Sequence, residues 1–173
     1  MNIPVQQRRL IVMRHAKAEP HHRSDHSREL TARGVADASE AGRFLRVHDL
    51  VPDHALVSTA ARTRGTWKAV AAGSGSAATA EFLDGLYDAG ADDALDTLRA
   101  ASDDVRVLIV IGHNPTMAYL AHELSDGAGE PAAVAALAQG YPTSALTVFD
   151  LKSGWEDLAR GHGTISRFHV GRG

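Results

Sequence analysis

The sequence predicts an α/β fold: a single three-layer α/β/α domain, with helices on both faces of a mostly parallel β-sheet. Two short apolar runs, at 10–13 and 105–111, are bounded by polar residues, as is typical of buried strands. Segments with the helical spacing of apolar residues lie between the predicted strands. Strands that alternate with helices favour a parallel sheet that is covered on both sides.

The first half of the chain contains three predicted strands. The strand at 10–13 leads into a polar loop at 19–28, and Thr31 is a plausible N-cap for a helix that ends near residues 48–50. The elements expected next are a strand at 54–58, a helix that runs towards residue 72, a turn at 73–76 and a strand at 79–83.

The second half begins with a predicted helix at 92–101 and the apolar strand at 105–111. Asn114 and Pro115 then predict a helix with Asn114 as its N-cap and Pro115 at its first position. The stretch after this helix is ambiguous, with a short helix at 131–138 as one interpretation. The last elements expected are strands at 144–151 and 164–170, around a turn at 152–154.

Length and composition limit the class of protein. The 173 residues suit one domain over 1–173, with a core from about residue 8 to 170 and no cap domain. The chain has a net charge of −3, no cysteine, and no apolar run that approaches membrane-spanning length. Residues 1–9 hold no segment that resembles a signal peptide. We therefore expect a cytoplasmic protein that binds neither nucleic acid nor membranes.

Polar residues that could bind a substrate or take part in catalysis follow three of the predicted strands. Arg14 and His15 end the first strand, His113 follows the strand at 105–111, and Ser58 ends a strand that Arg62 follows. The carboxyl ends of parallel strands face one crevice. Guanidinium groups bind phosphoryl oxygens and an imidazole can attack phosphorus, so this edge predicts a phosphoryl site.

Four ordered motifs carry a resemblance to a known family. They are Met13-Arg14-His15-Ala16, Arg28-Glu29-Leu30-Thr31-Ala32-Arg33-Gly34, Val57-Ser58-Thr59-Ala60-Ala61-Arg62-Thr63-Arg64-Gly65-Thr66 and Val110-Ile111-Gly112-His113-Asn114-Pro115. Over about residues 10–149 the chain resembles the histidine phosphatase superfamily, which contains the phosphoglycerate mutases, and within it the SixA-type phosphohistidine phosphatases. The resemblance implies a phosphoglycerate mutase-like fold.

The resemblance also implies a mechanism. His15 is the expected nucleophile, which forms a phosphohistidine intermediate, and Arg14, Arg62 and His113 are expected to hold the phosphoryl oxygens. No metal or other cofactor is expected. The implied substrates are a phosphohistidine protein or a small phosphorylated metabolite, with inorganic phosphate as product. Attack requires a neutral imidazole, so one His15 ring nitrogen should donate to a backbone carbonyl.

The proton donor is the point where the sequence departs from the mutase-like pattern. Many relatives have a glutamate in the loop that corresponds to 83–90, and here Glu81, Asp84 and Asp88 cannot be aligned with it. Asp25 matches an aspartate of SixA-type chains, so it is the candidate general acid, with a solvated loop carboxylate as the alternative. Imidazole leaves phosphorus more readily than an alkoxide does, so hydrolysis of phosphohistidine depends less on a proton donor than hydrolysis of an ester. The lack of a clear acid therefore favours a phosphoramidate substrate.

Other polar residues have two interpretations each. Arg28 could reach the rim of the substrate site or pair with a neighbouring carboxylate, and Ser58 could lie near the phosphate or only end its strand. His21, His22 and His26 could bind a metal ion, but their segment lacks helical periodicity, which favours a solvated loop.

Three alternatives to a phosphohistidine phosphatase stay open. The first is a broad-specificity phosphomonoesterase, and the second is a phosphate- or phosphoprotein-binding module without turnover. The third is a metal-dependent hydrolase that uses the histidine-rich loop. A monomer is the expected oligomeric state.

Overall fold

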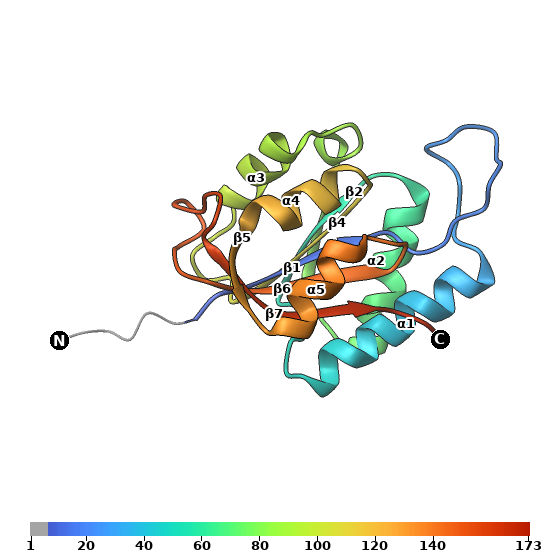
Figure 1. Cartoon of the computed structure of the whole chain (residues 1–173). Helices are drawn as coiled ribbons and strands as arrows, with labels where there is room; N and C mark the ends of the chain where they lie inside the picture. Colours follow the sequence, from blue (N-terminus) through green and yellow to red (C-terminus); the bar gives the residue numbers. More distant parts are fainter. Residues whose placement is uncertain (1–6) are drawn as a thin grey trace.

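In residues 7–173, which the computed structural model describes, the centre of the molecule is a seven-stranded sheet with the order β3-β2-β4-β1-β6-β7-β5 (Figure 1). The strands are β1 Arg9–Arg14, β2 His54–Ser58, β3 Thr79–Leu83, β4 Val107–Gly112, β5 Ser125–Gly129, β6 Ala145–Leu151 and β7 Gly163–Val170. The helices are α1 Ala32–Val47, α2 Ala61–Ser74, the 3₁₀ turn η1 Asp84–Leu86, α3 Ala91–Arg99, α4 Thr116–Leu124 and α5 Pro131–Gln139.

The sheet is mostly parallel, as predicted. Strands β1, β2, β3 and β4 run parallel to their neighbours among themselves, and β5 is parallel to β7. Strand β6 is antiparallel to both β1 and β7. The short connection between β6 and β7 accounts for the antiparallel pairing of these two strands, because a parallel pair needs a long crossover.

Helices cover both faces of the sheet, so the predicted three layers are confirmed. Helices α1 and α2 lie on one face, and α3, α4 and α5 lie on the other (Figure 1). In β1, Leu10 and Val12 belong to the core under α3 to α5, whereas Ile11 and Met13 belong to the core under α1 and α2. Burial on both faces accounts for the unbroken apolar run of this strand.

The register of the central strands brings the site residues to one level. Met13 pairs with Ile111 and Arg14 pairs with Gly112, so β1 and β4 end side by side. The pairing continues beyond β1, because the His15 amide donates to the Gly112 carbonyl at 3.0 Å. His15 and His113 thus follow two adjacent strand ends.

Some boundaries differ from the prediction. Helix α2 runs to Ser74 and ends at Gly75, which has φ +72°, so the turn starts later than residue 73. Asn114 is not the N-cap of α4: Pro115 takes that position, and the Asn114 side chain instead donates to the Tyr141 carbonyl at 2.9 Å. This amide is thereby used to fix the loop beside the site.

Strand β5 was not predicted. Its sequence, Ser-Asp-Gly-Ala-Gly, has no apolar alternation, and it pairs with β7 only at two irregularly spaced points. At Gly129, with φ +133°, a Cβ would lie 2.1 Å from the Ile165 carbonyl oxygen. The close backbone approach, and not a hydrophobic pattern, therefore defines this strand.

None of the helices within 7–173 is long and apolar enough to cross a membrane. The expectation for residues 1–9 falls largely on residues 1–6, which lie outside the described part of the chain.

Candidate active site

His15 and His113 meet at the carboxyl ends of β1 and β4. Their ring centroids are 5.4 Å apart, with an interplanar angle of 56°. Arg62 comes from the first turn of α2, which follows β2, the neighbour of β4. The predicted convergence of three strand ends is therefore present in the fold. The loop between β1 and α1 extends from this end of the sheet (Figure 1).

The His15 ring has the form that a nucleophile requires. Its Nδ1 lies 2.7 Å from the Ala16 carbonyl oxygen, and a carbonyl only accepts, so Nδ1 carries the proton and Nε2 keeps its lone pair. The expected donation to a backbone carbonyl is confirmed. Burial lowers the pKa of His15 to about 4, and the positive charges of Arg62 and Arg14 act in the same direction. His15 is thus neutral at physiological pH.

Arg62 and Arg14 place two guanidinium groups at the site. Arg62, only 5% exposed, donates to the Asp25 carbonyl at 2.8 Å and to Asp25 Oδ2 at 3.1 Å. Arg14 donates to the Tyr141 carbonyl at 3.1 Å. Within 7–173 the buried Nε of each arginine has no hydrogen-bond partner. Both side chains are held by one part of the guanidinium and retain donors for an anion.

His113 is a second neutral imidazole. Burial is the main reason that its pKa falls to about 3, and the charge of Arg62 adds to the effect. Its Nε2 lies 2.8 Å from the hydroxyl oxygen of Ser58, whose side chain is fully buried. Ser58 therefore contacts His113 and does not face the rim of the site.

Asp25 is the centre of a network of charged groups on the loop after β1. Its Oδ1 accepts from Arg28 Nε at 2.9 Å, and its Oδ2 accepts from Arg62 and, at 2.6 Å, from the Tyr87 hydroxyl. The Tyr87 hydrogen bond is the largest cause of a pKa well below the usual range for aspartate. Asp25 is therefore ionised in this arrangement. Arg28 pairs with this carboxylate and also donates to the Glu19 carbonyl at 3.1 Å.

Tyr87 is a site residue that we did not predict from the sequence. It directly follows η1, and its ring lies edge-on to His113, with centroids 5.5 Å apart. The Arg62 guanidinium lies 5.9 Å from the centroid of the same ring. The signal available in the sequence was its position in the loop 83–90, in which only carboxylates were expected to reach the site.

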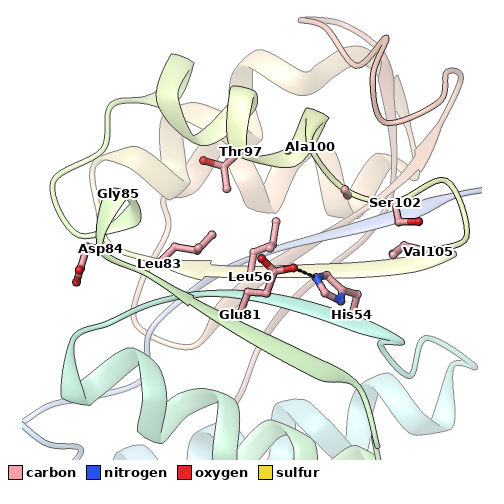
Figure 2. Close-up of a pocket in the computed structure, with 11 residues that line it drawn as sticks. His54, Leu56, Glu81, Leu83, Asp84, Gly85, Thr97, Ala100, Ser102 and Val105 are labelled. Carbon is pink, nitrogen blue, oxygen red and sulfur yellow. Dashed lines mark hydrogen bonds and ion pairs between the residues drawn. The ribbon is translucent and has the colours of Figure 1, made fainter.

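The three other candidate acids do not join this network. Glu81 pairs with His54 at 2.8 Å (Figure 2). Both residues line a cavity of about 540 Å³ between β3 and α3. This cavity is separate from the site, because its lining includes neither the two arginines nor the two histidines described above. Asp84, at the end of the same cavity, accepts from Thr59 at 2.7 Å, and Asp88 is exposed.

The histidine-rich loop does not form a cluster of metal ligands. His21 and His22 are exposed, and His22 contacts Ser27, whereas His26 lies 3.0 Å from the Thr59 hydroxyl. Across the described residues, no three side chains of metal-binding type converge.

Comparisons with known proteins agree with this geometry. Residues 10–92 match the model of the histidine phosphatase superfamily (branch 1). The chain is 37% identical to an uncharacterized protein of Mycobacterium tuberculosis, over 92% of this chain and 100% of that protein.

Two solved structures are similar throughout. One is a Nakamurella multipartitia protein provisionally assigned as the phosphohistidine phosphatase SixA, with 32% identity, a TM-score of 0.84, and coverage of 95% of this chain and 96% of that one. The other is the protein histidine phosphatase SixA in complex with tungstate, with 26% identity, a TM-score of 0.76, and coverage of 94% and 96%.

Proposed function

This chain belongs to the histidine phosphatase superfamily, in its SixA-type branch, and from that premise we propose that it removes phosphoryl groups from phosphohistidine through a covalent intermediate on His15. The proposal rests above all on the state of His15. Its Nδ1–H is held by the Ala16 carbonyl at 2.7 Å, and this leaves a neutral ring with a free Nε2. A buried neutral imidazole beside two guanidinium groups is suited to attack phosphorus.

The first step transfers the phosphoryl group to the enzyme. The lone pair of His15 Nε2 forms a bond to phosphorus while the bond from phosphorus to the leaving group breaks. Arg14, Arg62 and His113 hold the three phosphoryl oxygens as negative charge develops on them. Electrostatic stabilisation of this kind supplies most of the catalysis, and the fixed arginines provide the positive charge without a metal ion.

The second step regenerates the enzyme. The oxygen of a water molecule bonds to phosphorus, the bond from phosphorus to Nε2 breaks, and its electron pair returns to the ring. His15 keeps its Nδ1 proton, so both protons of the water leave with the product as dihydrogen phosphate. The Ala16 carbonyl stabilises the imidazolium that exists between the two steps.

The state of Asp25 favours phosphohistidine as the substrate. The leaving group of a phosphate ester is an alkoxide, which needs a proton. The leaving group of a phosphohistidine that is protonated on its other ring nitrogen is a neutral imidazole. Asp25 is held in its ionised form by Tyr87, Arg28 and Arg62. We therefore propose that Asp25 orients Arg62 and does not donate a proton. Both solved relatives described above have names that refer to phosphohistidine or histidine phosphatase activity.

The physiological substrate in this proposal is a phosphorylated protein, and the enzyme acts as a cytoplasmic monomer. The exposed loop of residues 21–26 carries Asp25, which contacts Arg62 of the site, so a partner protein that docks on this loop would bring its phosphohistidine close to the site. A small phosphorylated metabolite is the alternative substrate, and it would make the protein a broad phosphomonoesterase.

The decisive experiment compares wild type with His15→Ala on a phosphohistidine protein and on p-nitrophenyl phosphate, with a chelator present. We expect turnover of the phosphohistidine protein by wild type, acid-labile phosphate on wild type after a rapid quench, and neither with His15→Ala. His122→Ala, which changes an exposed histidine of α4, is the matched control and should retain full activity.

Other outcomes would contradict the proposal. Preference for p-nitrophenyl phosphate and for other esters would support the phosphomonoesterase. Binding of phosphate by a folded wild type without turnover of either substrate would support a binding module. Wild-type activity that is present without the chelator and lost when the chelator is added would support a metal-dependent hydrolase.

A further inference from the structure

The geometry points to Ser58 as a positioning residue that fixes the tautomer of His113, so that Nδ1–H of His113 faces the phosphoryl group. The inference rests on the proposed phosphoryl site but concerns a residue that lies outside it. Ser58 is the last residue of β2, His113 follows β4, and these two strands are paired neighbours.

The first step concerns the hydroxyl of Ser58. Its side chain is fully buried, and within the described chain His113 Nε2, at 2.8 Å, is its one hydrogen-bond partner. A hydroxyl has one proton to donate, and a buried donor without an acceptor is costly. If Nε2 carried a proton and donated it to Ser58, the hydroxyl proton would have no acceptor. Satisfying the hydroxyl therefore requires that Ser58 donates to an unprotonated Nε2. Each tautomer leaves one buried donor without an acceptor in the protein, the hydroxyl or the Nδ1–H, and of these two the Nδ1–H belongs to the ring beside the nucleophile, where a bound phosphoryl group can accept from it.

The second step concerns the other nitrogen of His113. A neutral imidazole has one ring proton, and with Nε2 unprotonated this proton is on Nδ1. Nδ1 is buried and has no hydrogen-bond partner among residues 7–173. The same ring stands 5.4 Å from that of the nucleophile, centroid to centroid. A buried N–H beside the nucleophile, without a partner in the protein, is suited to a ligand acceptor.

The two tautomers would act on a phosphoryl group in opposite ways. With the proton on Nδ1, His113 donates a hydrogen bond to a phosphoryl oxygen and stabilises the transition state. With the proton on Nε2, a lone pair would face the anionic oxygens and repel them. A hydroxyl that never touches the substrate can therefore control catalysis through the orientation of one proton.

The test reads the tautomer directly by ¹⁵N-resolved NMR of the histidine rings near pH 7. In the wild type without ligand, we expect His113 to show a protonated Nδ1 and an unprotonated Nε2. Inorganic phosphate should then shift the Nδ1 resonance of His113. A wild-type His113 with its proton on Nε2 would overturn the inference, whatever the activity of the protein.

Two variants separate positioning from a structural effect. Ser58→Ala should yield a mixture of His113 tautomers and about a tenfold lower kcat/KM. Ser58→Thr, which keeps the hydroxyl, should restore the Nδ1–H form and part of the activity. Ser153→Ala is the matched control, because Ser153 also contacts a histidine, His162, at 3.3 Å, in the β6–β7 connection.

The outcomes distinguish this inference from the proposed function. An unchanged tautomer in a folded Ser58→Ala would exclude control by Ser58, even if kcat/KM fell. The expected tautomers without phosphohistidine turnover would refute the proposed substrate and leave the Ser58 assignment intact, because the NMR experiment needs no reaction.

Discussion

The Tyr87 hydroxyl donates a hydrogen bond of 2.6 Å to Asp25 Oδ2, although the two residues are 62 positions apart in the sequence. Arg62 donates to the same oxygen at 3.1 Å. Tyr87 follows η1 and Asp25 lies on the loop after β1, so one carboxylate oxygen connects two loops with the start of α2. The orientation of Arg62, a group that we expect to bind phosphate, thus depends on a tyrosine that faces it across Asp25.

Tyr87→Phe tests this dependence. Loss of the hydroxyl leaves the ring beside His113 but removes a charge-assisted hydrogen bond from a partly exposed site, so we expect about a fivefold fall in kcat/KM, equivalent to ~1 kcal/mol. Steady-state kinetics with a phosphohistidine protein provide the measurement. Tyr119→Phe removes the hydroxyl of an exposed tyrosine on α4 and serves as the control. Equal kinetics for both variants would show that the Tyr87 hydroxyl has no role.

Asp25→Asn distinguishes the orientation of Arg62 from general acid catalysis. The amide keeps the shape of the side chain but loses its charge, so Arg62 is less firmly oriented and we expect KM to rise about tenfold while kcat changes little. The measurement is a set of kcat and KM values between pH 5 and 9. A lower kcat at unchanged KM, with loss of the alkaline limb of the profile, would instead assign Asp25 as the acid. Asp96→Asn, an exposed change on α3, is the control.

The sequence predicted the fold and the core of the site for a physical reason. The apolar runs of β1 and β4 mark buried strands, and parallel pairing forces the residues after them to one edge, so Arg14, His15 and His113 could be placed without coordinates. The role of Tyr87 could not be predicted from the sequence, because it depends on where two loops meet. β5 could not either, since its pairing depends on a glycine backbone contact and not on an apolar pattern.

The pKa values of the two histidines predict how stability changes with pH. The pKa of His15 falls to about 4 in the folded state, so from about pH 6.5 down to 4 the unfolded chain binds a proton that the folded protein does not. The free energy of unfolding should therefore decrease as the pH is lowered through this window, by up to about 1.4 kcal/mol per pH unit from His15. His113, whose pKa falls to about 3, adds an effect of the same sign that extends to lower pH.

Urea unfolding at pH 7, 6 and 5 measures this slope. His15→Gln should reduce it without abolishing it, because of the two imidazoles with a lowered pKa in the folded state only His113 remains. His122→Gln, at an exposed position on α4, controls for the loss of a histidine outside the site. A slope that is identical in wild type and His15→Gln would mean that His15 is not held neutral by the fold.

Oxyanions should stabilise the protein through Arg62. The site holds two guanidinium groups with unpartnered buried nitrogens, so phosphate, vanadate or tungstate should bind the folded state and not the unfolded chain. At a concentration of about 100 times Kd, the expected gain is about 2.7 kcal/mol, or roughly 5–10 °C in Tm. Thermal unfolding with and without vanadate measures the shift. Arg62→Ala should lose most of it, whereas Arg64→Ala, which removes an arginine stacked 4.4 Å from the centroid of the Phe82 ring, should retain it. Equal shifts in the two variants would place the oxyanion elsewhere on the surface and remove Arg62 from the phosphoryl site.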